Sequence, residues 1–255
     1  MRAFAPVTLG HGGRTLRGWQ LGTVSRDASA ALLVHGFGST DTGGQQLFVQ
    51  TARTLAEHGS VVRSYSRLGH GTSDGDFADI TIGDEVDQVV AMIRALAADA
   101  AGPVHVVAHS LGAVESAMAA ARVPELVATL TLWSPAGVVV DDIARHDRIQ
   151  GQPLARAREQ GWFDFGGMAL GTAFIDEVTA GLDVYATIDR YTGHAEVLHG
   201  TADQIVPVRY GQRYGEVLPG ATFTAVEGAD HGWSSVPWRR TLLDHLVAST
   251  GGGAR

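Results

Sequence analysis

The feature that most constrains this chain is an apolar run that ends at a serine between small residues. Residues 104–113 read VHVVAHSLGA, which predicts a buried strand that turns sharply into a helix and exposes the hydroxyl of Ser110. Ala108 and Gly112 lie two residues before and after the serine, and small side chains there permit so tight a turn. The pattern is A-x-S-x-G where G-x-S-x-G is usual. A serine that merely caps a core helix is the alternative interpretation of this stretch.

Composition excludes several classes of protein. The chain has 255 residues, of which 45% are hydrophobic and 18% charged, enough for one large domain with a substantial core. A formal net charge of -8 and the lack of a basic run argue against nucleic-acid partners. There is no cysteine for disulfides or thiolate chemistry, and the 11 histidines show no metal-ligand spacing, so no metal is expected.

Targeting signals are the next feature to consider. No stretch approaches the ~20 apolar residues that cross a bilayer, so a membrane is not an expected partner. The first six residues lack the apolar core of a secretory signal, so the expected location is cytoplasmic. The glycine-rich segment 251–255 is expected to be a frayed tail.

Apolar and amphipathic segments alternate along most of the chain. Expected strands are 7–9, 15–21, 30–34, 61–66, 104–109, 126–133, 195–198 and 222–226. Expected helices are 46–58, 84–98, 110–121, 208–217 and 238–247. This alternation predicts an α/β fold, with a mostly parallel twisted sheet covered by helices on both faces and a hairpin at its edge. The rhythm breaks between 137 and 190, which we interpret as an inserted cap subdomain within a single domain spanning 1–255.

Three chemically complementary side chains follow predicted strands. Ser110, Asp203 and His231 each lie just beyond a strand, in the order nucleophile, acid, base. The ends of parallel strands share one edge of a sheet, so residues far apart in sequence can meet there. A serine hydroxyl needs a histidine to take its proton, and that histidine needs a carboxylate to orient it.

At these residues the sequence resembles the α/β-hydrolase fold family, from HGFG at 35–38 to the end of EGADH at 227–231. The phrases GHGTSDGDF at 69–77, LWSPA at 132–136 and HGTADQIVP at 199–207 make it most similar to the cinnamoyl or feruloyl esterase branch. The resemblance implies Ser110 as nucleophile, Asp203 as orienting acid and His231 as general base. It also implies an oxyanion hole formed by the backbone N–H groups of Phe37 and Leu111. No cofactor is expected, because the glycine pattern around residue 70 is not completed at Asp74.

The residues leave rival assignments open. Asp230 competes with Asp203 as the acid, although a neighbour in sequence rarely reaches around to the Nδ1 of His231. His35 is expected to hold the oxyanion loop, and His70 and His109 are expected to support the site or lie at the surface. The glycines around His70 do not complete a dinucleotide-binding pattern.

We therefore expect a serine hydrolase that cleaves carboxylic esters through an acyl-enzyme, with small or aromatic acyl groups such as hydroxycinnamates. An acyltransferase, thioesterase or lactonase with the same three residues is the enzymatic alternative, and a non-catalytic ligand-binding protein is the other. The expected partner is a small-molecule ester, and a homodimer is compatible with the sequence. Within 137–190, the candidates for a pocket wall or a small core are Trp162, Phe163, Phe165, Met168 and Phe174. Those for hydrogen bonds to ring hydroxyls are Asp141, Asp142, Asp164 and Tyr185.

Overall fold

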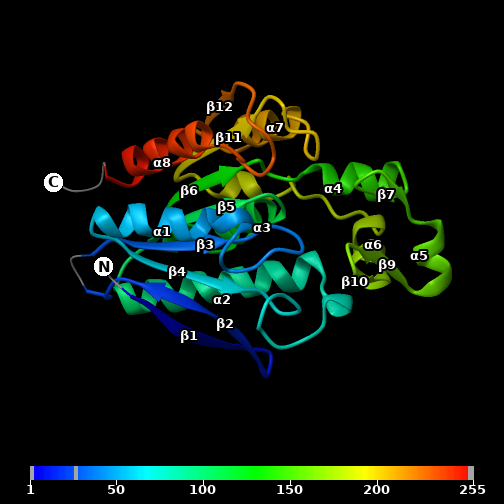
Figure 1. The fold of residues 1–255 in the computed structure, drawn as a ribbon, viewed down its shortest axis with the longest axis horizontal. Coiled ribbons are helices and arrows are strands. Elements are labelled where there is room, and N and C mark those ends of the chain that lie inside the picture. The colour runs from blue at the N-terminus through cyan, green and yellow to red at the C-terminus, as the bar shows by residue number, and fades with distance from the viewer. Residues whose placement is uncertain (1–2, 26–27, 252–255) are drawn as a thin grey trace.

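The computed structural model describes residues 3–25 and 28–251. Met1, Arg2 and residues 252–255, on which the expectations about a leader and a frayed tail partly rest, lie outside these ranges. An eight-stranded sheet forms the centre of the molecule (Figure 1). In order across the sheet, its strands are β1 (Phe4–His11), β2 (Arg14–Leu21), β4 (Val61–Ser66), β3 (Ala30–Val34), β5 (Val104–His109), β6 (Val127–Trp133), β11 (His194–Gly200) and β12 (Thr222–Val226).

The sheet is parallel except at one edge. β2 pairs antiparallel with both β1 and β4, and every pair from β4 to β12 is parallel. The edge hairpin forms where residues 12 and 13, both glycine with positive φ, allow a tight turn between β1 and β2. The predicted fold class, a mostly parallel sheet with an edge hairpin, is confirmed.

Helices cover both faces because the central strands are apolar on both sides. Along β3, Ala31 and Leu33 pack in the cluster that includes α1 and α8, whereas Leu32 and Val34 pack in the cluster of α2 and α3. The helices around the sheet are α1 (Leu47–Glu57), α2 (Ile82–Ala100), α3 (Leu111–Arg122), α7 (Arg209–Val217) and α8 (Val236–Gly251). Short 3-10 turns are η1 (Gly44–Gln46), η2 (Phe77–Asp79), η3 (Pro124–Leu126) and η5 (Ile188–Arg190).

Residues 138–190 form small elements that gather at one end of the molecule, beyond the carboxyl end of β6 (Figure 1). They are α4 (Val138–Val140), the π-helical turn η4 (Asp141–Arg145), β7 (Arg148–Ile149), β8 (Gln152–Pro153), α5 (Ala155–Gln160), β9 (Trp162–Phe165), β10 (Met168–Gly171) and α6 (Thr172–Thr179). The antiparallel pair β9–β10 was not anticipated. It forms because residues 166 and 167, both glycine with positive φ, turn the chain between two short strands.

Candidate active site

Ser110 occupies the sharp turn between β5 and α3. Its φ of 59° and ψ of -125° lie in a region that residues other than glycine rarely adopt, so the turn is strained. A Cβ at Gly112 would lie 2.1 Å from the carbonyl oxygen of His35, which explains why the second residue of α3 is a glycine. Ala108 is fully buried and in regular strand conformation, so the unusual alanine is accommodated.

The structure brings Ser110, Asp203 and His231 together. Asp203 follows β11 and His231 follows β12, so both reach the edge of the sheet at which β5 ends. The Nδ1 of His231 lies 2.7 Å from Asp203 Oδ2, and its Nε2 lies 3.0 Å from Ser110 Oγ. This continuous chain of hydrogen bonds is the arrangement in which imidazole can take a proton from the serine hydroxyl. Asp230 instead accepts a hydrogen bond from the backbone N–H of Ser234.

Asp203 is held as a carboxylate. Burial alone would raise its pKa, but hydrogen bonds from His199 and His231 and from the backbone N–H of Val206 outweigh that effect. The pKa of Asp203 therefore lies well below its usual range. Its Oδ1 accepts from the N–H groups of Ile205 and Val206 at 2.9 and 2.7 Å, which leaves Oδ2 facing the two imidazoles.

Two further histidines support this arrangement. His199 Nε2 lies 3.2 Å from Asp203 Oδ2 and 2.8 Å from the carbonyl oxygen of Val206. His109 lies 2.8 Å, through Nε2, from the carbonyl oxygen of His231. Burial, and then the nearby His231, lower the pKa of His109 to about 3, so its ring is neutral and can donate this bond. His109 thus supports the site. The role of His199 was not expected from the sequence, although this residue lies four positions before Asp203 in the segment HGTADQIVP.

The loop after β3 brings Phe37 to the same cavity wall as Leu111. A Cβ at Gly36 would lie 2.8 Å from Ser110 Cβ, so the loop passes directly over the serine. As the first residue of α3, Leu111 has no intrahelical acceptor for its N–H. The N–H of Phe37 has no acceptor within the described part of the chain. Both residues thus line the same cavity as Ser110, and neither N–H has an acceptor among the described residues.

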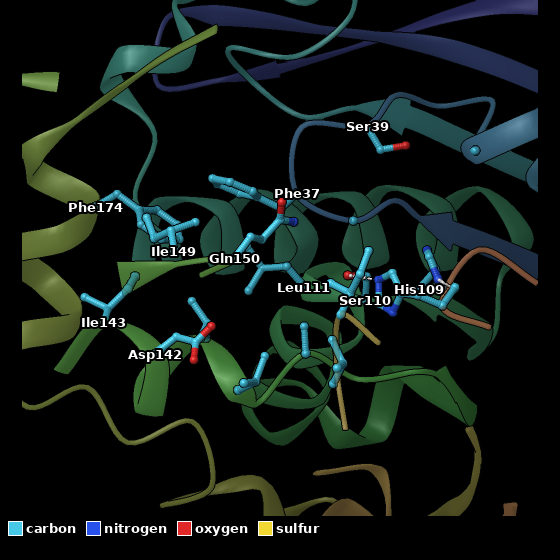
Figure 2. A pocket seen from close by; sticks show the side chains of 18 residues that line it. Phe37, Ser39, His109, Ser110, Leu111, Asp142, Ile143, Ile149, Gln150 and Phe174 are labelled. Atoms are coloured by element: carbon cyan, nitrogen blue, oxygen red, sulfur yellow. Dashed lines mark hydrogen bonds between the residues drawn. The ribbon is translucent and has the colours of Figure 1, made fainter. Parts of the chain in front are cut away.

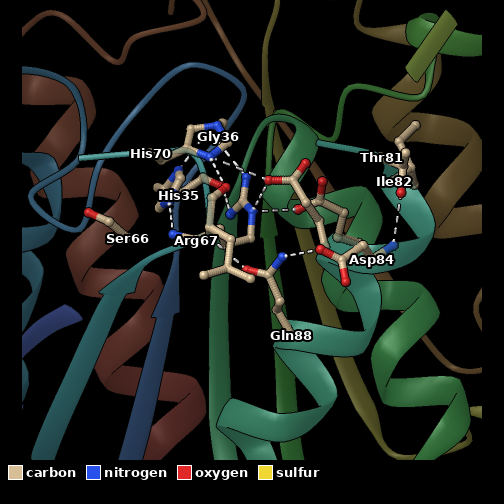
Figure 3. A network of polar contacts seen from close by, with 12 residues as sticks. His35, Gly36, Ser66, Arg67, His70, Thr81, Ile82, Asp84 and Gln88 are labelled. Carbon is tan, nitrogen blue, oxygen red and sulfur yellow. Dashed lines mark hydrogen bonds and ion pairs between the residues drawn. The ribbon is translucent and has the colours of Figure 1, made fainter. Parts of the chain in front are cut away.

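A buried arginine fastens this loop to the helices beneath it (Figure 3). The Arg67 guanidinium is fully buried and donates to the carbonyl oxygens of His35 and Gly36 at 2.6 and 3.4 Å. Its backbone N–H donates to His35 Nε2 at 3.0 Å, and the opposite nitrogen of that ring lies 2.8 Å from the Gly36 carbonyl. Burial, and then the charge of Arg67, lower the pKa of His35 well below its usual value, so this bridging ring is neutral. His35 therefore holds the loop, as expected.

Two buried glutamates complete the network. Arg67 Nε lies 2.6 Å from Glu85 on α2 and 3.3 Å from Glu115 on α3. Burial would raise the pKa of Glu85, but the charge of Arg67 brings it below its usual value. Burial, together with Glu85, raises the pKa of Glu115 well above its usual value despite Arg67. The network therefore favours the carboxylate form of Glu85 and the protonated form of Glu115. In the sequence, Glu115 is the single acidic residue inside the apolar run 111–121, and this isolation indicates that its carboxyl group needs a buried partner.

Ser110 opens into a cavity of about 270 Å³ (Figure 2). Most of its wall is apolar and includes Phe37 and Leu111 from the main fold and Phe174 from α6. The polar exceptions outside the serine–histidine chain include Asp142 and Gln150, both from the 138–190 segment. The amide of Gln150 was missed, because nothing local distinguishes it from an exposed loop residue.

Among the four candidates for hydrogen bonding to a ring hydroxyl, Asp142 lines the cavity. Asp141 accepts from Tyr210, and Asp164 accepts from the N–H of Gly167 in the β9–β10 turn. Tyr185 packs against Tyr214 and beneath Arg213. These three side chains therefore have structural contacts away from the cavity.

The five apolar candidates of this segment also differ in their environments. Phe163 and Phe174 are buried in the core, and Phe174 additionally faces the cavity. Phe165 contacts the ring of Phe37 with centroids 4.6 Å apart. Met168 lies beside the same loop, because a Cβ atom added to Gly38 would lie 3.0 Å from the methyl carbon of Met168. Trp162 is 41% exposed.

Other kinds of site are not evident within residues 3–25 and 28–251. No cluster of three or more His, Asp or Glu side chains there is arranged to hold a metal ion. No helix in those ranges is both long and apolar enough to span a membrane.

Comparisons with solved structures return the same fold. Est1E from Butyrivibrio proteoclasticus, with ferulic acid bound, aligns with a TM-score of 0.84 and 19% identity over 96% of this chain and 99% of its own. Alpha/beta hydrolase domain-containing protein 10 from mouse aligns with a TM-score of 0.81 and 19% identity, over 98% and 100%. A thioesterase domain from the curacin biosynthetic pathway aligns with a TM-score of 0.67 and 15% identity, over 96% and 99%.

A comparison with curated protein sequences finds no match. The sequence model of the alpha/beta hydrolase family matches residues 31–241, which contain every element from β3 to the first turn of α8, including the turn at Ser110 and the loops that bear Asp203 and His231. Because that match covers most of the chain and agrees with the sheet order, this protein belongs to the alpha/beta hydrolase family.

Proposed function

We propose that this protein is a serine hydrolase that cleaves carboxylic esters through an acyl-enzyme. The observation that carries the proposal is the hydrogen-bonded chain from Asp203 through His231 to Ser110, at 2.7 and 3.0 Å, in the wall of a cavity. A protein that only binds a ligand needs no such proton path, whereas ester cleavage depends on one.

In the proposed reaction, Ser110 Oγ attacks the ester carbonyl carbon while its proton passes to His231 Nε2. The N–H groups of Phe37 and Leu111 bind the negatively charged oxygen of the tetrahedral intermediate. The carbon–oxygen bond to the alcohol then breaks, and the alcohol leaves with the proton from His231. Water attacks the acyl-enzyme by the same path, with His231 as base, and releases the acid and free Ser110.

The cavity suits a compact acyl group. Its volume of about 270 Å³ lies near the lower end of the range for small-molecule sites, roughly 300–1,000 Å³. Phe37, Leu111 and Phe174 supply an apolar wall for a planar ring, and Asp142 and Gln150 supply polar atoms for a ring hydroxyl. A hydroxycinnamate combines these features, and ferulic acid is the compound bound to the similarly folded Est1E. We therefore propose small or aromatic acyl esters as substrates, with residues 137–190 acting as the cap over the site.

The decisive experiment is labelling with a fluorophosphonate probe, which reacts with activated serine hydroxyls. Wild-type protein should be labelled at Ser110, and Ser110→Ala should lose both labelling and almost all turnover. Ser39 is the other serine that lines the cavity, so Ser39→Ala is the matched control and should still be labelled. Labelling at another residue, or turnover at the wild-type rate by Ser110→Ala, would refute the covalent mechanism.

Substrate class is tested separately. We expect kcat/KM for methyl ferulate to exceed that for a short aliphatic ester clearly, and a long-chain triglyceride to be a poor substrate. The substrate panel also includes a thioester and a lactone, which distinguish the ester hydrolase from a thioesterase or a lactonase. An alcohol added as competing acceptor distinguishes it from an acyltransferase. Efficient cleavage of emulsified triglyceride with no turnover of ferulate would contradict the acyl preference and leave the covalent mechanism standing.

A further inference from the structure

A second cavity, of about 500 Å³, adjoins the one that contains Ser110. The two cavities share part of their walls, namely Val138, Asp142, Gln150 and Ile205. Asp142 and Gln150 are visible in the wall of the first cavity in Figure 2. A molecule whose ester group lies at Ser110 can therefore extend past these residues toward the second cavity.

The second cavity is lined by basic side chains, of which the two arginines carry a fixed positive charge. His146, Arg148 and Arg209 line it, and the acidic residue in its wall is Asp142. Arg148 Nε lies 3.3 Å from Asp142 Oδ1, so those two charges offset each other. Arg209 forms no ion pair with any residue in the described part of the chain.

Asp141, which precedes Asp142 in the chain, is also paired. Asp141 lies 3.0 Å from Arg145 and accepts a hydrogen bond of 2.6 Å from the hydroxyl of Tyr210. The Arg209 guanidinium packs 4.7 Å from the centre of the Tyr210 ring, which holds it at the cavity. Once these pairs are counted, the cavity retains the positive charge of Arg209, in a protein whose formal net charge is -8.

One surplus guanidinium matches a carboxylate better than a more highly charged group. Its planar fork of N–H donors fits the two oxygens of a carboxylate, and one positive charge balances one negative charge. The amide of Gln204, which lines the second cavity alone, adds a neutral donor in the same wall. The second cavity is therefore suited to a substrate that carries a carboxylate remote from its reacting ester.

The proposed mechanism indicates which part of the ester this is. The acyl part stays bound to Ser110 while the alcohol departs and water takes its place, so the alcohol part needs the side that opens outward. The second cavity has that character, since Gln204 and Arg209 are exposed and Ile205 is 49% exposed. We propose, on the basis of the function proposed above, that the second cavity binds a carboxylate on the alcohol part of the ester, with Arg209 as its main contact.

The test uses ferulate esters of ω-hydroxy carboxylic acids of increasing chain length, each paired with the corresponding primary amide. Binding to full-length Ser110→Ala protein is measured by calorimetry, so the result does not depend on turnover. At the best chain length, the carboxylate should bind about tenfold more tightly than the amide. Adding Arg209→Gln should abolish that preference, and Arg209→Lys should restore part of it.

Arg156 on α5 is the matched control, because it is an exposed arginine of the neighbouring segment that lies outside both cavities. Arg156→Gln should keep the full preference for the carboxylate. Equal binding of carboxylate and amide at every length, or a preference that survives Arg209→Gln, would overturn this inference. Failure of the proposed function would instead appear as absence of fluorophosphonate labelling at Ser110, which this binding assay does not involve.

Discussion

At the scale of single residues, the site depends on which partners each polar atom has. Asp203 accepts two backbone N–H bonds at one oxygen and faces two imidazoles with the other. Asp230 is next to His231 in sequence, yet its carboxylate bonds to the backbone of Ser234. Proximity along the chain is therefore a poor guide to which carboxylate orients an imidazole.

This difference gives a paired prediction. Asp203→Asn should lower kcat about ten-thousandfold, because an amide cannot hold His231 in the tautomer that accepts the serine proton. Asp230→Asn should keep kcat close to wild type, since its carboxylate serves only a local turn. Steady-state kinetics on one ester substrate, with circular dichroism to check folding, measures both. Comparable losses in the two variants would contradict the assignment of Asp203.

At the scale of elements, the turn from β5 into α3 is held by close backbone packing on one side and by buried charge on the other. Gly112 lets α3 approach the end of β3, where the loop over Ser110 begins. Arg67 joins that loop to α2 and α3 through Glu85 and Glu115. The position of the loop over Ser110 thus depends on three elements together.

The packing part of this account is tested by Gly112→Ala. A Cβ there would lie 2.1 Å from the carbonyl oxygen of His35 and 2.7 Å from that of Val34, so backbone must move. We expect the free energy of unfolding to fall by about 1–3 kcal/mol in urea titrations. Gly102→Ala is the control, because nothing lies within 4 Å of its Cβ position, and it should be neutral or slightly stabilising. Equal stability of the two variants would refute the tight contact.

The charge part is tested by Glu115→Gln through the pH dependence of stability. The pKa of Glu115 is raised in the folded protein, so the folded state keeps a proton that the unfolded chain loses above about pH 4.3. This contribution to wild-type stability is present at lower pH and is lost as pH rises toward the raised pKa, by about 1.4 kcal/mol per pH unit. Glu115→Gln removes that loss.

Urea unfolding at a series of pH values measures the difference in stability between Glu115→Gln and wild type. That difference should increase in favour of the variant as pH rises. Glu125→Gln, at an exposed glutamate, should follow the wild-type curve. A constant difference for Glu115→Gln would show that the proton is not held in the folded state.

At the scale of the whole molecule, the 138–190 segment is fastened to the main fold at identifiable points. The Glu177 carboxylate on α6 accepts from the backbone N–H groups of Ile82 and Gly83, at 2.7 and 2.9 Å, at the start of α2. Phe165 on β9 packs against Phe37 in the loop over Ser110. The segment that supplies much of the cavity wall is thus attached both to the start of α2 and to the loop over Ser110.

Glu177→Ala should loosen this attachment. It removes two charge-assisted hydrogen bonds and leaves two N–H groups of α2 without acceptors, at a cost of about 1 kcal/mol. Limited proteolysis within 138–190 should become faster, and KM should rise because Phe174 on the same helix lines the cavity. Glu159→Ala, at an exposed glutamate on α5, should match wild type in both measurements. Unchanged proteolysis in Glu177→Ala would contradict the proposed tether.

The regular part of the fold was predictable because its signals are local. Short apolar runs rich in β-branched residues, such as 104–109, favour buried strands, and the amphipathic periods between them specify the covering helices. The 138–190 segment was less predictable, because its strands have two to four residues and depend on contacts with the main fold. The sequence signal for its hairpin β9–β10 lies mainly in two glycines, Gly166 and Gly167.

The sequence by itself determined the alternating architecture, the strained serine turn and the order of serine, aspartate and histidine at strand ends. These follow from short-range patterns and from the rule that parallel strands end at one edge. Only the tertiary structure decided that Asp142 and Gln150 face the cavity, that Arg67 meets Glu85 and Glu115, and that Arg209 lines the adjoining cavity without an ion pair among the described residues. Such contacts join residues far apart in the chain, so they depend on how whole elements pack and leave no periodic trace in the sequence.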